Sequence, residues 1–205
     1  MKKILVNGKP RIPGKIVCVG RNYVQHIHEL GNEIPENLIV FLKPNSSISQ
    51  TLESEHLGEN LHYEGEISFL YENGGFSAVG FGLDLTKRDL QSRLKEKGLP
   101  WERAKAFDGA ALFSEFVSFH KDFSHLSLEL FINDQLKQTG TIDHMMYKPD
   151  EILGEVKLFM TLEDGDIIMT GTPKGVGLIK PGDSFSGRIR EDSVLLVEKE
   201  WKVKK

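Results

Sequence analysis

The chain has 205 residues, of which 39% are hydrophobic and 27% charged, a composition typical of a soluble globular protein with its own buried core. The net charge of −4 argues against a surface devoted to nucleic acid. No apolar run has the length of a membrane span. Only Ile4-Leu5-Val6 follows the initial lysines before a turn, so no signal peptide is predicted. We therefore expect a cytoplasmic protein that binds neither nucleic acid nor membrane.

The first quarter of the chain is predicted to contain short strands and one helix. Residues 1–6 and 12–19 have the pattern of strands around a turn at residues 7–10. The single cysteine, Cys18, lies in the second apolar run and is expected to be a small core residue rather than a nucleophile. Residues 23–30 are predicted to form a helix that ends at Gly31. The apolar run 40–42 then leads into a loop over residues 43–47.

Residues 61–70 (LHYEGEISFL) are the most informative stretch. Read as a strand with a period of two, they place Glu64 and Glu66 on the face opposite to the apolar side chains. Two strand steps span roughly 6.6 Å, so both carboxylates can reach one small ion. A strand with one hydrated face is the alternative. Glutamate is disfavoured in strands, and on this basis metal binding is narrowly preferred.

The next segment is predicted to be a returning strand followed by a helix. After a turn at 73–75, residues 76–83 read as a strand that ends at Asp84. Thr86 is predicted to be the N-cap of the helix, with Asp89 completing a capping box, and Gly98 and Pro100 are predicted to end it. A polar stripe on this helix contains Arg88, Gln91 and Lys95.

From residue 113 onward, short strands dominate the pattern. They are predicted at 126–132, 166–170, 184–189 and 194–198, with one further helix at 149–160. No repeat, linker or break in composition divides the chain. We expect a single α+β domain over residues 1–205, with strands dominant.

Asp84 supplies a third carboxylate beside Glu64 and Glu66, because its strand is expected to pair with theirs. Three oxygen donors suit Mg²⁺, Mn²⁺ or Ca²⁺ better than zinc. Three protein ligands also leave positions open for water or a chelating substrate, as a Lewis-acid catalyst requires. The alternative is that Asp84 only faces the positive end of the following helix.

Other side chains are candidates for acid–base chemistry and anion binding. His26 and Glu29 are spaced as a general-base dyad, although a solvated pair on an exposed helix face has the same spacing. The Gly-rich loop at 170–177 lacks the pattern of a nucleotide-binding loop, but its N–H groups could hold an oxyanion or carboxylate. Cations that could bind substrate carboxylates, with an ordinary surface role as the default, are Arg21, Lys43, Arg88 and Lys105.

Together these motifs resemble the fumarylacetoacetate hydrolase superfamily, in particular its short acylpyruvase and oxaloacetate decarboxylase branch. The resemblance spans residues 16–187. The segments that carry it are 20–23 (GRNY), 41–44 (FLKP), 61–66 (LHYEGE), 83–91 (LDLTKRDLQ), 98–101 (GLPW), 105–108 (KAFD) and 171–177 (GTPKGVG).

The resemblance implies a mixed β-sheet roll with a few short helices, a homodimer, and Mg²⁺ or Mn²⁺ bound by the carboxylates of Glu64, Glu66 and Asp84. It also implies that His26 and Glu29 activate water on a mobile lid, whose continuation over residues 30–37 bears on substrate choice. Lys105 is implied to be catalytic as well. The residues expected to contact the substrate are Arg21, Lys43, Arg88, Gln91 and Thr172.

The expected reaction is hydrolysis of a C–C bond in an acylpyruvate or related 2,4-dioxo acid, with a pyruvate enolate as leaving group stabilised by the metal. The same enolate chemistry leaves oxaloacetate decarboxylation or tautomerisation open. An isomerase or decarboxylase of aromatic catabolism and a 2-oxo-acid hydratase are further alternatives. A non-enzymatic module with a structural ion is a less favoured one.

Overall fold

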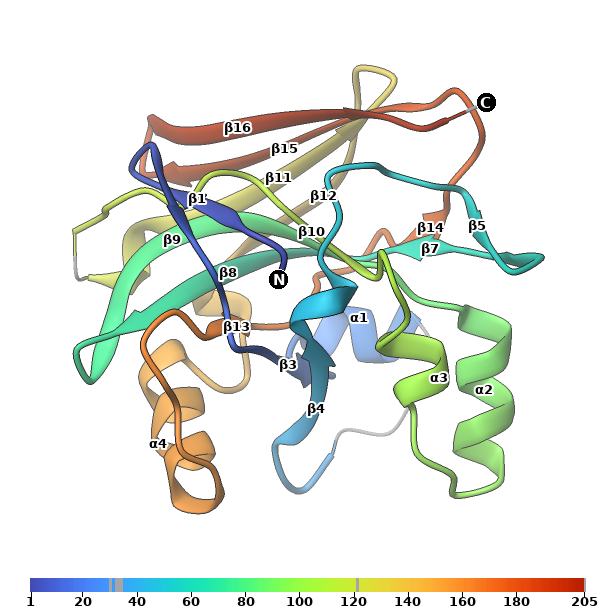
Figure 1. Cartoon of the computed structure of the whole chain (residues 1–205), viewed down its shortest axis with the longest axis horizontal. Helices are drawn as coiled ribbons and strands as arrows, with labels where there is room; N and C mark the ends of the chain where they lie inside the picture. Colours follow the sequence, from blue (N-terminus) through green and yellow to red (C-terminus); the bar gives the residue numbers. More distant parts are fainter. Residues whose placement is uncertain (30, 32–34, 121, 205) are drawn as a thin grey trace.

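A computed structural model of the protein describes residues 1–29, 31, 35–120 and 122–204. A six-stranded sheet and a four-stranded sheet make up most of it (Figure 1). The order of the larger sheet is β10 (Ala111–Phe113), β9 (Gly75–Asp84), β8 (Gly65–Glu72), β13 (Ile167–Met169), β3 (Lys15–Gly20) and β4 (Ile39–Pro44). Because β13 runs parallel to β3 and antiparallel to β8, this sheet is mixed.

The smaller sheet is antiparallel throughout, with the order β12 (Gln135–Thr141), β11 (Leu126–Ile132), β15 (Ser184–Glu191) and β16 (Val194–Lys202). Three strand pairs complete the β-structure: β1 (Ile4–Val6) with β2 (Lys9–Arg11), β5 (Glu55–His56) with β6 (Glu59–Asn60), and β7 (His62–Tyr63) with β14 (Gly177–Leu178).

The helices in the described part of the chain are all short: α1 (Val24–Glu29), α2 (Arg88–Glu96), α3 (Glu102–Lys105), α4 (Pro149–Phe159) and the 3₁₀ turns η1 (Asn45–Ser47), η2 (Phe123–His125) and η3 (Ile142–His144). The predicted strand-dominated α+β fold with a mixed sheet is therefore confirmed. None of the helices in the described ranges is long and apolar enough to span a membrane.

The main core lies between the two sheets. Apolar side chains of β8 and β9, such as Phe69 and Phe81, are fully buried together with Leu128 and Phe185 of the smaller sheet. Each such side chain contributes on the order of 1.5–3 kcal/mol by leaving water. The second face of β8 is buried as well, so the alternative of a strand with one hydrated face is wrong. Polar groups on that face need partners within the protein.

Local turn chemistry corrects the predicted N-terminal hairpin. Asn7 and Gly8 both have positive φ, at 46° and 74°, which makes a two-residue turn suited to a tight hairpin. The chain therefore returns at once as β2, which pairs with β1. Residues 9–10 belong to this strand rather than to the turn, and the later strand β3 belongs to the six-stranded sheet.

Two further predictions are corrected by tertiary contacts. The loop is predicted to begin at residue 43, but Lys43 and Pro44 are the last two residues of strand β4. Thr86 is not the N-cap of the following helix: α2 begins at Arg88, its N-cap is Lys87, and no side chain caps it. Thr86 instead pairs with His62 as an isolated β-bridge. The end of this helix is as predicted, with Gly98 at φ 62°.

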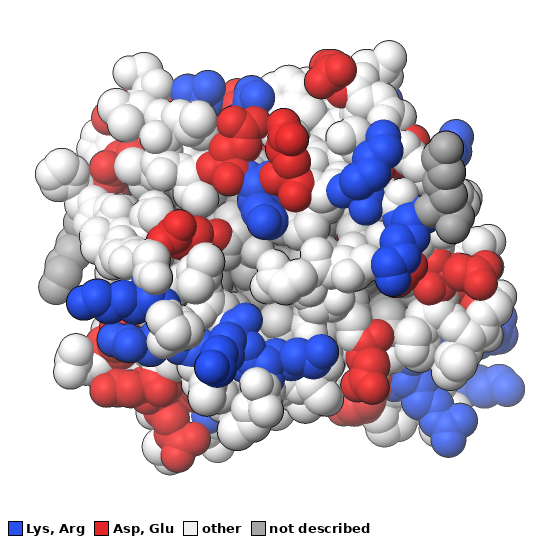
Figure 2. All heavy atoms as spheres, turned by 45° about the horizontal axis from the view of Figure 1, so that its top comes forward, with Lys and Arg blue, Asp and Glu red and all other residues white. Residues whose placement is uncertain are grey.

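Several predicted elements agree closely with the structure. β11 has the predicted bounds, and α4 ends one residue before the predicted end. α1 covers most of the predicted 23–30 helix, but residue 30 and much of the expected lid (32–34) lie outside the described residues. Cys18 is fully buried in β3, as expected. Figure 2 shows basic and acidic side chains interspersed over one face of the molecule.

Candidate active site

Three buried carboxylates meet where β8 begins and β9 ends. Glu64 lies between β7 and β8, Glu66 is the second residue of β8, and Asp84 is the last residue of β9. The antiparallel register brings Glu66 opposite Gly82, and the Asp84 N–H donates to the Glu64 carbonyl at 2.9 Å. One ligand oxygen from each carboxylate lies within 4.8 Å of the others. The side chains thus converge as the strand period indicates, although Glu64 itself interrupts the predicted strand.

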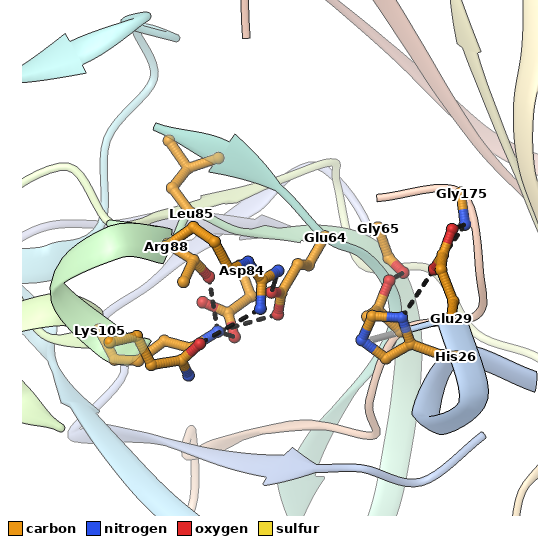
Figure 3. A network of polar contacts seen from close by, with 12 residues as sticks. His26, Glu29, Glu64, Gly65, Asp84, Leu85, Arg88, Lys105 and Gly175 are labelled. Carbon is orange, nitrogen blue, oxygen red and sulfur yellow. Dashed lines mark hydrogen bonds and ion pairs between the residues drawn. The ribbon is translucent and has the colours of Figure 1, made fainter. Parts of the chain in front are cut away.

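Cations contact two of these carboxylates, Glu64 and Asp84 (Figure 3). Lys105 Nζ lies 2.8 Å from Glu64 Oε2, 2.7 Å from Asp84 Oδ2 and 2.6 Å from Thr86 Oγ1. Arg88 forms an ion pair with Glu64, and Lys43 Nζ lies 2.8 Å from Asp84 Oδ1. Lys43 and Lys105 are almost completely buried. The default expectation that they are ordinary surface cations is therefore wrong. Their interaction with the carboxylates offsets the cost of burying them.

The surroundings shift the pKa values of Glu64 and Glu66 in opposite directions. Burial alone raises the pKa of the Glu64 carboxyl, but the adjacent Lys105 and Arg88 charges outweigh it and hold the pKa below its ordinary value. Burial also raises the pKa of Glu66, and the nearby negative charges of Asp84 and Glu64 raise it further. The N–H of Gly171 donates to Glu66 Oε2 at 2.8 Å but does not reverse this shift. Glu66 is thus the carboxylate that most needs additional positive charge.

The carboxylate cluster fits a hard divalent cation. All three donors are carboxylate oxygens, which suit Mg²⁺, Mn²⁺ or Ca²⁺. Asp84 Oδ1 is buried and accepts no hydrogen bond from the described residues; its contact with Lys43 is an ion pair without hydrogen-bond alignment. This leaves a lone pair for a metal ion. The raised pKa of Glu66 has the same implication, because a bound cation would favour its ionised form.

His26 and Glu29 form a pair beside the carboxylate cluster. His26 Nδ1 lies 3.1 Å from Glu29 Oε2, and in Figure 3 the His26 ring lies between Glu29 and the cluster. The Gly175 N–H holds Glu29, 3.0 Å from Oε1 and 3.2 Å from Oε2. His26 is only 6% exposed, so it is not a solvated histidine on an open helix face, whereas the Glu29 side chain remains 35% exposed. The Gly-rich loop thus holds carboxylates of its own chain, Glu66 and Glu29.

Gly175 cannot be replaced without moving this loop. Its φ is 97°, and a Cβ there would lie 2.1 Å from the carbonyl oxygen of Lys137. The absence of a side chain lets the loop approach β12 closely and directs the Gly175 N–H at Glu29.

A narrow pocket with a cavity volume of about 30 Å³, partly open to solvent, connects these groups. Of the predicted site residues, Glu29 and Lys43 lie behind the lining, in contact with His26 and Asp84. The predicted residues that line the pocket are Arg21, His26, Glu64, Glu66, Asp84, Arg88, Gln91, Lys105 and Thr172.

Three residues at or beside the pocket were not among the predicted site residues. Lys95 and Trp101 line it. The sequence pattern placed Lys95 on one polar stripe with Arg88 and Gln91, as the structure does, but Lys95 was not predicted to be a site residue. Gln138 is buried beside the pocket on β12, a strand that the sequence pattern did not reveal. No local signal marks Gln138, because its partners lie far away in the sequence.

The sequence profile described as fumarylacetoacetate (FAA) hydrolase C-terminal matches residues 15–74 and 76–196. The chain belongs to the fumarylacetoacetate hydrolase family. This family member is 35% identical to an oxaloacetate tautomerase of Escherichia coli (strain K12) over 189 residues, covering 84% of this chain and 86% of that protein. It is 38% identical to a mitochondrial oxaloacetate decarboxylase of Dictyostelium discoideum over 185 residues, covering 82% and 85%.

A solved structure supports the same relationship. The fumarylpyruvate hydrolase of Pseudomonas aeruginosa, in complex with Mn²⁺ and pyruvate, superposes with a TM-score of 0.88 at 29% identity, covering 99% of this chain and 95% of that one. The protein described here is thus a fumarylacetoacetate hydrolase family enzyme. The tautomerase and decarboxylase relatives favour the alternative reaction over the predicted acylpyruvate hydrolysis.

Proposed function

We propose that this fumarylacetoacetate hydrolase family enzyme interconverts the keto and enol forms of oxaloacetate, with decarboxylation as a second reaction through the same enolate. The observation that carries this proposal is the buried carboxylate cluster, flanked by Lys105 and Arg88 and facing the pocket. The identity to an oxaloacetate tautomerase and an oxaloacetate decarboxylase supports the choice of substrate.

In this proposal Glu64, Glu66 and Asp84 hold Mg²⁺ or Mn²⁺. When bound, such an ion polarises the 2-oxo group of a chelating substrate and lowers the energy of the enolate. Because Lys105 and Arg88 already contact the metal-binding carboxylates, they are placed to stabilise negative charge that develops beside them. Gln91 and Thr172 line the same pocket and are proposed to orient the substrate.

The proton transfer is assigned to His26. The imidazole accepts the proton from C3 of the keto form as the electron pair of the C–H bond moves toward the 2-oxo oxygen. Delivery of that proton to the oxygen completes the enol. Glu29, 3.1 Å from His26 Nδ1, stabilises the imidazolium formed between the two steps. The Gly175 N–H in turn fixes Glu29.

Hydrolysis of a 2,4-dioxo acid is the second candidate. It is favoured by the His26–Glu29 pair, which could equally activate a water molecule, and by the similarity to the fumarylpyruvate hydrolase. In that reaction water attacks the distal carbonyl, the C–C bond breaks, and pyruvate enolate leaves.

The decisive experiment compares three reactions of the purified protein after metal removal and reconstitution with Mg²⁺ or Mn²⁺. Tautomerisation is followed by enol absorbance, decarboxylation by pyruvate formation, and hydrolysis by loss of fumarylpyruvate or acetylpyruvate. We expect the highest kcat/KM for oxaloacetate tautomerisation, dependent on the metal. A higher kcat/KM for dioxo-acid cleavage would show that hydrolysis of a 2,4-dioxo acid is the main reaction instead.

The homodimer, which the family resemblance implies, and the cytoplasmic location, which is expected from the composition and the absence of targeting signals, remain proposals. Light scattering during gel filtration tests the homodimer, and a monomeric mass would reject it. Fractionation of the source cells tests the location. This test is needed because the relatives include a bacterial and a mitochondrial protein.

A further inference from the structure

Lys95 lines the same pocket as Arg88 and Lys105. It is on α2, four residues beyond Gln91 and seven beyond Arg88, and all three line the pocket. Its ammonium lies 4.6 Å from the centroid of the Trp101 ring. Such a cation–π contact orients the charge without neutralising it.

Two other cations that line the pocket, Arg88 on α2 and Lys105 on α3, form ion pairs with the carboxylate cluster. Arg88 pairs with Glu64, and Lys105 pairs with both Glu64 and Asp84. Among the residues that the structure describes, no carboxylate forms an ion pair with Lys95. Burial lowers the pKa of Lys95 and the positive charges of Arg21, Lys105 and Arg88 add to this effect, so that the pKa falls to about 8 although the negative charge of Glu64 opposes the shift. In the surroundings of Lys95, three positive charges thus outweigh the negative charge of Glu64, and no carboxylate in the described ranges contacts the Lys95 ammonium as an ion pair.

The spacing of Arg88 and Lys95 along α2 is of the same order as the reach of a short diacid. Seven residues of helix advance about 10.5 Å along the axis, and Arg88 marks the level of the carboxylate cluster because it contacts Glu64. A metal–oxygen bond of roughly 2.1 Å, a four-carbon backbone of roughly 4 Å and a charge-assisted hydrogen bond of about 2.8 Å cover a span of the same order. A substrate that chelates a metal at the cluster could thus reach Lys95 with its far end.

We propose that Lys95, held over Trp101, binds the distal carboxylate of a four-carbon 2-oxo diacid whose 2-oxo-acid end lies at the carboxylate cluster. Lys95 thereby makes the pocket selective for diacids over monocarboxylic 2-oxo acids. This inference rests on the proposed function for the position of the chelating end. It goes further by assigning the group that distinguishes oxaloacetate from an acylpyruvate.

Binding of inert analogues tests the subsite without turnover. Malate and lactate share a 2-hydroxy-acid end, but only malate has a second carboxylate. By calorimetry with Mg²⁺-loaded protein, we expect wild type to bind malate at least about tenfold more tightly than lactate, the scale of one charge-assisted hydrogen bond. Lys95→Met should abolish this preference and Lys95→Arg should retain most of it. Exposed Lys97, two residues away, provides the matched control Lys97→Met, which should behave as wild type.

Oxalate binding reports on the chelating end alone and should be equal in wild type and Lys95→Met. In kinetics, Lys95→Met should raise KM for oxaloacetate about tenfold and leave KM for acetylpyruvate unchanged. Retention of the malate preference by folded Lys95→Met would overturn the proposal, as would equal loss of malate and lactate binding. If wild type fails to convert oxaloacetate but Lys95→Met still abolishes the malate preference, the proposed reaction fails and the diacid subsite stands.

Discussion

Gln138 and Gly65 contact each other directly beside the pocket. The Gly65 N–H donates to Gln138 Oε1 at 2.9 Å, and a Cβ at position 65 would lie 3.0 Å from the same oxygen. Gln138 Nε2 also donates to Thr172 Oγ1 at 2.9 Å, while the Thr172 hydroxyl donates to the Gly65 carbonyl at 2.9 Å. Because Gly65 separates Glu64 from Glu66, this network fixes the backbone that carries two of the proposed metal ligands.

Gly65→Ala should disturb this network. The new methyl would approach Gln138 Oε1 and the Phe81 ring, each at 3.0 Å, so we expect a loss of about 1–3 kcal/mol in the free energy of unfolding. Mg²⁺ affinity should fall as well. Denaturant unfolding and Mg²⁺ calorimetry measure both. Gly75→Ala is the matched control, because Gly75 also lies in a strand and a Cβ there meets nothing within 4 Å. Unchanged stability and metal affinity in Gly65→Ala would contradict the proposed constraint.

Glu66→Gln should change how the stability of the metal-free protein depends on pH. A carboxyl whose folded pKa is raised contributes stability below its unfolded pKa and loses it as pH rises through the folded value. In EDTA, wild type should therefore lose stability as pH rises above about 4.3 and up through the raised pKa of Glu66. The variant should lack this component. Its melting temperature relative to wild type should increase with pH, and exposed Glu96→Gln should show no such trend.

Metal binding should stabilise the folded protein, because an ion that binds only the native state raises the free energy of unfolding. After chelation, added Mg²⁺ or Mn²⁺ should restore activity and raise the melting temperature of wild type. Asp84→Asn and Glu66→Gln should reduce both responses, since an amide lacks the charge that offsets dehydration of the ion. Full activity of exhaustively chelated protein with no detectable metal would refute the metal assignment.

His26→Ala and Glu29→Gln should slow the three candidate reactions of this pocket to different extents. Tautomerisation and dioxo-acid hydrolysis both need proton transfer by His26 in our scheme, so each should fall by roughly 10²-fold or more. Decarboxylation breaks a C–C bond without removing a proton from C3 and should fall less. Rates on oxaloacetate and acetylpyruvate test this at equal metal content. Equal losses in all three reactions would indicate that His26 positions the lid or substrate instead.

Lys105→Met should affect folding as well as activity. It would leave Glu64 and Asp84 buried without the ammonium that contacts both, and the removal of one partner from a buried ion pair costs on the order of 3–5 kcal/mol. Denaturant unfolding in EDTA measures this cost, and added Mg²⁺ should recover part of it. Lys97→Met serves as the exposed control. A variant as stable as wild type would mean that the ion pairs do not stabilise the fold.

The sequence alone determined the parts of the site that depend on short-range geometry. Side chains two residues apart on a strand point the same way, which placed Glu64 and Glu66 together. The turn at residues 73–75 makes the next strand antiparallel, so Asp84 had to return close to them. The bounds of β11 and the extent of α4 followed from periodicity and turn residues for the same reason.

Only the tertiary structure decided which polar residues became buried and what they contact. Thr86 has the local pattern of a helix cap, yet its hydroxyl accepts a hydrogen bond from Lys105. Lys43 has the pattern of a loop cation, yet it is buried against Asp84. Gln138 reaches the site from the other sheet, 73 residues from Gly65. Burying a polar group is costly unless partners compensate for lost water. Because those partners come from distant parts of the chain, no local pattern can reveal them.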